Sequence, residues 1–122
     1  MILSIVVPVY NNALTLKETF NQICEKVSNK RKDFKVEVVF VDDGSIDDSW
    51  QTIKSLASLK DDCVKVKCIK LSRNFGQLSA TLCGYEMATG NAVVTLSADL
   101  QDPIDLIPQM VEHFLGGFEV VI

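Results

Sequence analysis

The chain has 122 residues, 48% of them hydrophobic, and a mean hydropathy of +0.20, which excludes a disordered tail. Its formal net charge of −4 argues against a nucleic-acid partner, because polyanions favour basic proteins. No apolar run approaches the roughly 20 residues that cross a bilayer. The N-terminal stretch "MILSIVVPVYNN" has neither the basic start nor the small-residue cleavage site of a signal peptide. We therefore expect one cytoplasmic domain with a real core.

Apolar strands alternate with helical patterns in the first half of the chain. Residues 2–9, "ILSIVVPV", predict a nearly continuous apolar strand, and apolar positions at helical spacing predict a helix over residues 14–27. A second strand, "VEVVFVDD", is expected over residues 36–43. The turn Asp-Asp-Gly-Ser follows it. Its serine opens a capping-box pattern, Ser-x-x-Asp, which predicts a helix over residues 45–59.

The second half continues the alternation. The strand expected over residues 64–72, "VKVKCIKLS", alternates more than the first two, so one of its faces is expected to be exposed. A helix over residues 77–88 is ended by the glycine two residues later. Residues 91–97, "NAVVTLS", predict a fourth strand, and residues 102–117 predict a helix that stops at a Gly-Gly pair. Residues 118–122, "FEVVI", begin a fifth strand.

This order of elements predicts an α/β fold. Strand and helix alternate throughout, and the strands are apolar enough to be buried on both faces. Such a pattern is typical of a mostly parallel sheet with helices on both faces. Residues 1–122 are read as a single domain.

The cysteines and the single histidine offer no metal cluster. Four cysteines lack CxxC spacing and sit in apolar patterns, which favours buried thiols over zinc ligands or disulfides. His113 falls in the last predicted helix without partners for a ligand or base role, so we expect it at the surface.

Polar side chains follow four of the predicted strands. In open parallel sheets, ligands bind in the crevice beyond the carboxyl ends of the strands, so these groups are expected to meet at one edge. The groups are Pro8, Tyr10, Asn11 and Asn12; Asp42, Asp43, Gly44 and Ser45; Ser72, Arg73, Asn74, Phe75 and Gly76; and Ser97, Asp99, Gln101 and Asp102.

The types of these residues suit a nucleoside diphosphate. The two carboxylates after the second strand can accept hydrogen bonds from a nucleobase imide N–H or from ribose hydroxyls. Tyr10 offers a flat face to a base. Asp99 and the Gln101 carbonyl are hard oxygen ligands that suit Mg²⁺ or Mn²⁺. Arg73 can neutralise a phosphate by bidentate bonding.

Each cluster can also be explained by local structure alone. Asp-Asp-Gly-Ser is common helix-start chemistry, and Asn11 with Asn12 can serve as a helix N-cap. Arg73 can be a surface residue. Asp102 can cap a helix whose first position is Pro103, and capping and ligand binding can share that turn. The absence of a G-x-G-x-x-G or G-x-x-x-x-G-K-[ST] loop counts against a dinucleotide-binding or P-loop site.

The motifs "IVVPVYNN", "VVFVDDGSIDDS", "LSRNFGQLSATLCGYEMATGN" and "VVTLSADLQDP" together carry a resemblance that covers essentially the whole chain. The sequence resembles family-2 glycosyltransferases with the Rossmann-like GT-A nucleotide-sugar-binding fold. It is most similar to their polyprenyl-phosphate branch, which includes dolichyl-phosphate mannose synthase and bacterial undecaprenyl-phosphate glycosyltransferases.

The resemblance implies a role for each matching residue. Those expected around the nucleobase and the rest of the donor are Pro8, Tyr10, Asn12, Asp42, Asp43, Arg73, Asn74 and Gly76. Asp99 and Gln101 would hold the Mg²⁺ or Mn²⁺ that bridges the donor diphosphate. Asp102 would lie close to the transferred sugar or cap the helix, which makes Asp99 and Asp102 the expected catalytic pair.

Two positions depart from the family pattern. Asn12 stands where glutamate is frequent in this branch. Ser97 stands where the first aspartate of a D-A-D triplet is common, which removes one carboxylate from the expected metal shell.

The resemblance implies an inverting transfer of a sugar from a UDP- or GDP-linked donor to a polyprenyl phosphate in cell-envelope glycan synthesis. The enzyme would work at the inner face of the cytoplasmic membrane. Residues 1–122 would be the N-terminal donor-binding part, inactive alone, with the acceptor half and membrane-contacting segments beyond Ile122.

Three alternatives stay open. The acceptor can be a hydroxyl of a soluble glycan or polysaccharide. The chain can be a non-catalytic nucleotide-binding module, if Ser97 marks a degenerate metal site. A phosphoacceptor receiver domain is the third, although receivers place their acidic pair after the first strand, whereas Asp42 and Asp43 follow the second.

Overall fold

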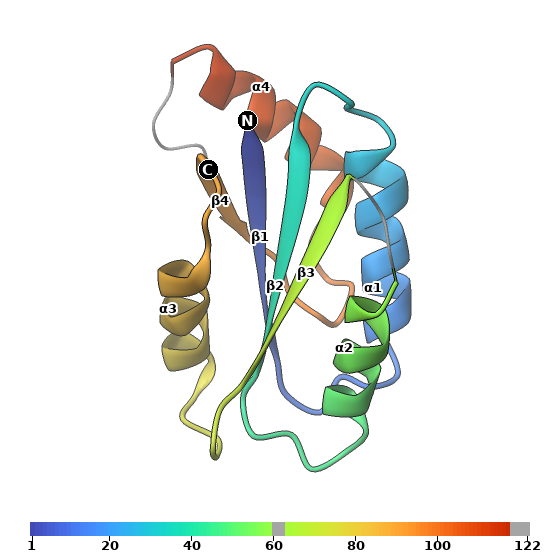
Figure 1. Cartoon of the computed structure of the whole chain (residues 1–122), viewed down its shortest axis with the longest axis vertical. Helices are drawn as coiled ribbons and strands as arrows, with labels where there is room; N and C mark the ends of the chain where they lie inside the picture. The colour runs from blue at the N-terminus through green and yellow to red at the C-terminus, as the bar shows by residue number, and fades with distance from the viewer. Residues whose placement is uncertain (60–62, 118–122) are drawn as a thin grey trace.

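Four parallel strands form the central sheet of the structure, a computed structural model that describes residues 1–59 and 63–117 (Figure 1). The strands are β1 (Ile2–Val9), β2 (Lys35–Asp42), β3 (Val64–Lys70) and β4 (Ala92–Thr95). Their order is β3-β2-β1-β4, and all three pairings are parallel. The predicted parallel α/β sheet is confirmed. The fifth strand expected over residues 118–122 lies outside the described residues.

Helices cover both faces of this sheet, as the sequence predicts. The helical elements are α1 (Leu16–Ile23), the π-helix η1 (Cys24–Ser28), α2 (Ser49–Ala57), α3 (Gln77–Met87), the 3₁₀ helix η2 (Ile104–Leu106) and α4 (Ile107–Leu115). α3 packs on β1 and β2 from one side, whereas α1, α2 and α4 share the core on the other side (Figure 1). Within the described ranges, none of the helices is long and apolar enough to cross a membrane.

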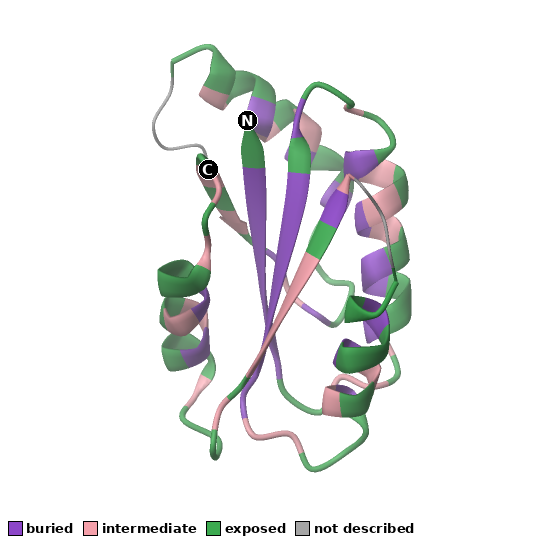
Figure 2. Cartoon of the chain, viewed as in Figure 1, coloured by how far each residue is buried: buried purple, intermediate pink, exposed green. Residues whose placement is uncertain are grey.

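The two central strands are buried along nearly their whole length (Figure 2). Side chains alternate between the two faces, so Val7 and Phe40 join the larger core and Val6 and Val39 pack under α3. The ring centroids of Phe20 and Phe40 lie 6.4 Å apart where α1 meets β2. These strands form a rigid platform whose carboxyl ends carry the polar residues.

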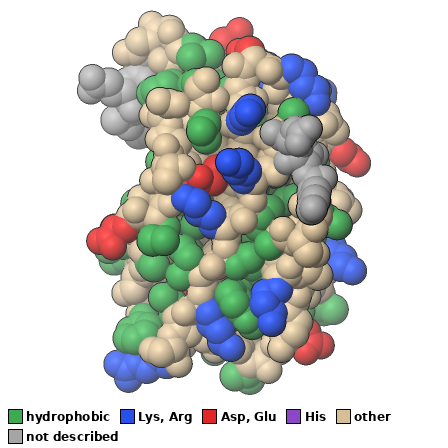
Figure 3. Space-filling model, in the orientation of Figure 1, with side chains coloured by type: hydrophobic (Ala, Val, Ile, Leu, Met, Phe, Trp, Pro, Cys, Tyr) green, Lys and Arg blue, Asp and Glu red, His purple; other side chains and the backbone are tan. Residues whose placement is uncertain are grey.

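The outer strands are more exposed than the central ones. β3 is largely half-buried, as its alternating pattern predicts, and Lys and Arg side chains appear among hydrophobic ones on this side of the molecule (Figures 2 and 3). For β4 the expectation of burial on both faces is wrong, because Val93 is 46% exposed. Among the described strands β4 pairs only with β1, and α3 packs on β1 and β2 instead.

Helix starts differ from the local patterns. The capping-box prediction is wrong, because α2 begins at Ser49 and it is Asp47 Oδ1 that accepts a hydrogen bond from the Ser49 N–H, at 2.9 Å. The expected Asp102 cap is wrong too, since η2 begins at Ile104 with Pro103 before it and no side-chain cap. In both segments the acidic side chains form hydrogen bonds with another loop or turn. The local sequence spacing therefore does not determine their hydrogen-bond partners.

Three smaller predictions have mixed outcomes. The first helix starts at Leu16 and continues as a π-helix to Ser28. The cysteines are half-buried rather than buried. His113 is exposed on α4, as expected, and the stop at Gly116 and Gly117 is confirmed.

Gly84 lets α3 approach β1 closely. A Cβ atom at this position would lie 2.4 Å from Val6 Cγ1, which is itself fully buried. We expect Gly84→Ala to lower the free energy of unfolding by about 1–3 kcal/mol, because overpacking outweighs the better helix propensity of alanine. Urea denaturation measures this, with Ser79→Ala on the exposed side of α3 as the control. A Gly84→Ala variant as stable as the wild type would contradict the close packing.

Candidate functional site

A cavity of about 360 Å³ lies at the carboxyl ends of β1, β2 and β4. Seven of the predicted site residues line it: Pro8, Tyr10, Asn12, Asp43, Asn74, Gly76 and Asp99. Four others do not line it: Asp42, Arg73, Gln101 and Asp102. Gln77, Ser97 and Ala98 also contribute to its wall. The predicted convergence of separate segments at one sheet edge therefore occurs, while the role of each residue stays a prediction.

The loop after β1 is held in place by the loop after β2. The Asn11 N–H donates to Ser45 Oγ at 2.9 Å, and the Asn12 N–H donates to Ser49 Oγ at 2.9 Å. In return the Ile46 N–H donates to Asn11 Oδ1 at 3.0 Å. Asn11 adopts a φ of +54°, a conformation that asparagine tolerates better than most residues. These bonds fix the segment that carries Tyr10 and Asn12 into the cavity wall.

Asp47 adds a further contact to the same pair of loops. Its Oδ2 accepts a hydrogen bond from the Ala13 N–H at 3.2 Å. Partial burial alone raises the pKa of the Asp47 carboxyl, but hydrogen bonds from Ser49 and Ala13 outweigh it, so the pKa lies below its ordinary value. Sequence reasoning missed Asp47 and Ser49 because their partners lie more than 30 positions away in the chain.

The loop of residues 73–76, which leads from β3 into α3, is bound to Asp43. Asp43 Oδ1 accepts a hydrogen bond from the Phe75 N–H at 2.8 Å, and Oδ2 accepts one from the Gly76 N–H at 3.1 Å. Asn74 Nδ2 donates to the Asp43 carbonyl oxygen at 3.1 Å and lies 3.4 Å from Oδ2. The Arg73 guanidinium stacks over the Phe75 ring, 4.7 Å from its centroid.

The turn of residues 97–102 presents Asp99 to the cavity. The Ser97 N–H donates to Asp102 Oδ2 at 2.7 Å, and the Ser97 hydroxyl donates to Asp99 Oδ1. The Gln101 N–H also donates to Asp99 Oδ1, at 3.3 Å, while Leu100 adopts a φ of +66°. Asp102 therefore stabilises this turn instead of the following helix. Ser97 connects the two carboxylates.

The same turn is tied to α1. The carbonyl oxygen of Ala98 accepts hydrogen bonds from the Thr15 hydroxyl at 2.6 Å and from the Thr19 hydroxyl at 3.2 Å. Thr19 is fully buried. The backbone beside Asp99 is thus fixed independently of the Asp99 side chain. Neither threonine stands out in the sequence, because both fit an ordinary helical pattern.

Asp42 is fully buried at the end of β2. Its Oδ1 accepts a hydrogen bond from the Ser45 N–H at 3.2 Å, but its Oδ2 has no hydrogen-bond partner among the described residues. Buried polar atoms are nearly always hydrogen-bonded, because leaving one unsatisfied is costly. Asp42 Oδ2 is therefore an unsatisfied buried acceptor, and the next residue in the chain, Asp43, lines the cavity.

The oxygen ligands at the cavity suit a metal ion that is also bound by a substrate better than one held by protein side chains alone. Within residues 1–59 and 63–117 no group of three or more His, Cys, Asp or Glu side chains could hold a metal ion. Asp99 is an exposed carboxylate at the cavity, with the Ser97 hydroxyl beside it. Mg²⁺ and Mn²⁺ are commonly bound through one or two carboxylates, with waters and substrate phosphates as the other ligands. The donor set therefore fits a divalent cation that shares its shell with a diphosphate.

The sheet and its site together define an open α/β protein with a cavity beyond the carboxyl ends of its parallel strands, the place where ligands bind in sheets of this kind. The model of glycosyl transferase family 2 matches residues 4–122. The chain belongs to this family.

Curated relatives agree with the match. The chain is 44% identical over 118 residues to the uncharacterized glycosyltransferase YkcC of Bacillus subtilis, covering 97% of this chain and 35% of the relative. It is 41% identical over 118 residues to the undecaprenyl-phosphate 4-deoxy-4-formamido-L-arabinose transferase of Pseudomonas fluorescens, with 97% and 34% covered. The chain thus spans about a third of the length of the curated relatives it matches.

Solved structures confirm the GT-A fold. The mannosyltransferase PcManGT of Pyrobaculum calidifontis, in complex with GDP-Man and Mn²⁺, is 26% identical with a TM-score of 0.74, covering 90% of this chain and 31% of that one. TarS of S. aureus (residues 1–349), in complex with UDP-GlcNAc, is 23% identical with a TM-score of 0.73, and 95% and 31% are covered.

Proposed function

We propose that the complete protein is an inverting glycosyltransferase. It moves a sugar from a nucleoside-diphosphate sugar to a polyprenyl phosphate in cell-envelope glycan synthesis, and residues 1–122 form its donor-binding part. The observation that carries this proposal is the cavity at the strand ends with Asp99 at its wall, in a chain of glycosyl transferase family 2. Relatives named undecaprenyl-phosphate transferases support the choice of acceptor.

The nucleobase end of the donor is assigned to the residues after β1 and β2. Tyr10 is 48% exposed, so its ring is available to stack on a base, and Pro8 and Asn12 line the same wall. Asp42 is assigned to the ring N–H of the base: its Oδ2 is unsatisfied, and although it does not itself line the cavity, it directly precedes Asp43, which does. Uracil and guanine both carry such an N–H, which fits a UDP- or GDP-linked donor.

The diphosphate end is assigned to the other two segments. Asp99 would hold Mg²⁺ or Mn²⁺, with Gln101 two residues on as a second oxygen donor and Asp102 toward the transferred sugar. Bound there, a divalent cation supplies positive charge to the departing diphosphate. Asn74 and Gly76 also line the cavity, and Arg73 on the same loop provides a guanidinium for a phosphate.

A phosphate acceptor suits the groups that are present. A phosphate monoester with a second pKa near 6 is largely ionised at neutral pH, so it attacks without a general base. A hydroxyl acceptor needs a positioned base in addition to the carboxylates assigned to the metal and the sugar, and His113, the single histidine, lies exposed on α4 rather than at the cavity. Because a polyprenyl chain holds its phosphate at a bilayer, the proposed place of action is the inner face of the cytoplasmic membrane.

A transfer assay with the complete protein tests this proposal. Vesicles containing undecaprenyl phosphate are supplied with radiolabelled UDP- and GDP-sugars and with Mn²⁺ or Mg²⁺. We expect label in the lipid fraction, in a product whose anomeric configuration is inverted. Chelation of the metal ion should prevent formation of this product. Undecaprenol in place of its phosphate is the matched control acceptor.

The outcomes separate the alternatives. Transfer only to undecaprenol or to a soluble glycan would replace the phosphate acceptor by a hydroxyl acceptor. Binding of donor with neither transfer nor hydrolysis would identify a non-catalytic module, and absence of donor binding would overturn the proposal.

A further inference from the structure

We propose that Asp43 is a positioning residue. It holds the loop of residues 73–76 as one wall of the donor cavity and does not itself bind the donor. This inference deepens the proposed function and rests on it for the identity of the ligand. The anchoring of the loop is a property of the protein without any ligand.

The hydrogen bonds of Asp43 are directed at the loop. The residue is 3% exposed, and both of its carboxylate oxygens accept backbone N–H groups, from Phe75 and Gly76. Its main-chain oxygen accepts from the Asn74 side chain as well. Hydrogen bonds to an ionised acceptor are roughly twice as strong as neutral ones. Asp43 is therefore engaged by three consecutive loop residues, two of them through its carboxylate oxygens.

The neighbouring glycine, Gly44, also packs directly against the loop. Gly44 has a φ of +73°, and a Cβ atom there would lie 2.4 Å from the Asn74 nitrogen and 2.5 Å from the Arg73 carbonyl carbon. These are backbone atoms, which cannot rotate away as a flexible side chain would. The turn after β2 thus touches the loop so closely that position 44 accepts only glycine.

The loop matters because it forms part of the cavity. Asn74, Gly76 and Gln77 line the wall, and Arg73 is held over the Phe75 ring on the same loop. Gly76 has a φ of +103° immediately before α3 begins at Gln77. Without Asp43, the Phe75 and Gly76 N–H groups lose their acceptor. The wall and the guanidinium are then free to leave the position that a donor requires.

Amide hydrogen exchange on the complete protein, without donor, tests the anchor directly. We expect Asp43→Ala and Asp43→Asn to speed exchange at Phe75 and Gly76 by at least about tenfold, while amides in β1 and β2 keep their protection. Gly44→Ala should give the same local signature with the carboxylate intact. Asp42→Asn, one position away, is the matched control and should leave exchange at Phe75 and Gly76 unchanged. The asparagine variant preserves side-chain volume and decides the test where the alanine variant does not fold.

Donor binding supplies the second readout. With UDP or GDP and Mn²⁺, the Asp43→Asn variant should bind with at least about tenfold higher Kd. Unchanged protection of Phe75 and Gly76 in Asp43→Asn would overturn the anchoring role. If the wild type binds neither nucleotide, the proposed function fails while the exchange experiment still decides the anchor.

Discussion

Replacing Asp99 by alanine is expected to lower metal-dependent sugar transfer by the complete protein by at least about 100-fold. Asp99 is the carboxylate that the turn of residues 97–102 presents to the cavity. The turn should survive the substitution, because the Ser97 N–H still donates to Asp102 and the Ala98 carbonyl still accepts from Thr15. The expected loss is therefore chemical rather than structural. Initial transfer rates over a Mn²⁺ titration measure it.

Asp105→Ala is the matched control for this experiment. Asp105 is an exposed carboxylate six positions further on, paired with Lys26 Nζ at 3.0 Å and outside the cavity lining. Exposed ion pairs contribute little to stability, so we expect transfer within about twofold of the wild type. Transfer by Asp99→Ala at the rate of the control would remove Asp99 from the metal site.

The parts of the fold that sequence predicts are those fixed by local chemistry. β1 and β2 are largely apolar, β-branched runs, and in a chain of alternating strands and helices such runs are expected at the centre of a parallel sheet. The exposure of β4 could not be predicted in the same way. Its apolar sequence resembles that of a central strand, but its exposure depends on strand order and on where α3 packs.

The same distinction between local and long-range interactions applies to the site. Polar residues at strand ends could be located, because parallel topology brings those ends to one edge. The partners of Ser45 and Asp102 could not, since a capping pattern considers only residues within one helical turn. Ser45 instead accepts from Asn11, 34 positions earlier, and Asp102 accepts from Ser97.

Ser97 illustrates the limit of counting carboxylates in a motif. In the sequence, Ser97 occupies a position where the family pattern has an aspartate, which weakens the predicted metal shell. In the structure its hydroxyl donates to Asp99 and its N–H donates to Asp102, so it orients one carboxylate and uses the other to close the turn. The sequence identifies the residue, but its role depends on three-dimensional contacts that the sequence does not show.

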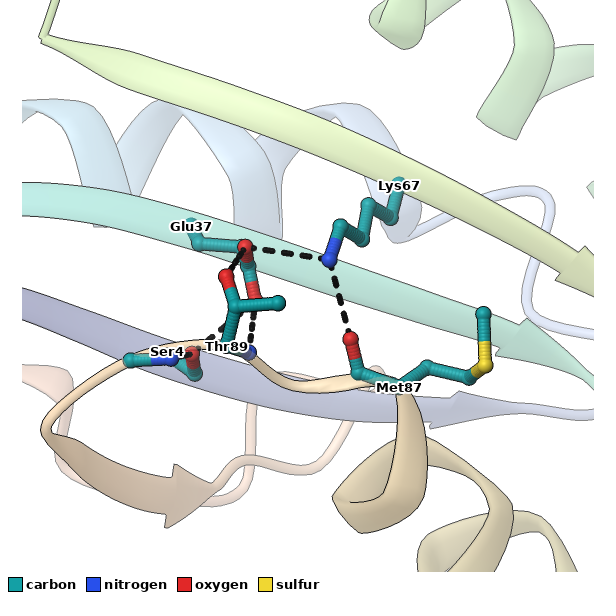
Figure 4. A network of polar contacts seen from close by, with 6 residues as sticks. Ser4, Glu37, Lys67, Met87 and Thr89 are labelled. Carbon is teal, nitrogen blue, oxygen red and sulfur yellow. Dashed lines mark hydrogen bonds and ion pairs between the residues drawn. The ribbon is translucent and has the colours of Figure 1, made fainter.

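Glu37→Ala is expected to lower the free energy of unfolding by about 1–3 kcal/mol. Glu37 is 4% exposed within β2 and accepts hydrogen bonds from the Ser4 hydroxyl, the Thr89 N–H and the Thr89 hydroxyl (Figure 4). Lys67 Nζ on β3 lies 3.3 Å from its Oε2 and donates to the Met87 carbonyl oxygen. Removal of this carboxylate takes the acceptor from the buried Ser4 hydroxyl and from the Thr89 N–H and hydroxyl.

Urea denaturation measures the loss, and Glu86→Ala, at an exposed position of α3, is its control. The network ties β1, β2 and β3 to the segment between α3 and β4, at the end of the sheet away from the cavity. Its loss should therefore affect stability more than donor binding. A Glu37→Ala variant no less stable than Glu86→Ala would show that the network contributes nothing.

The pH dependence of stability gives the same residue a second test. Burial alone raises the pKa of the Glu37 carboxyl, but hydrogen bonds from Thr89, Ser4 and Lys67 outweigh it, so the pKa lies below its ordinary value of 4.5. A carboxyl with a lowered pKa in the folded state contributes stability that is fully present above the unfolded value and is lost as the pH falls through the folded value. Because Glu37→Gln cannot ionise, the stability difference between wild type and Glu37→Gln should shrink as the pH is lowered below 4.5. A difference that stays constant from neutral pH down to acid unfolding would mean that the charge of Glu37 does not stabilise the sheet.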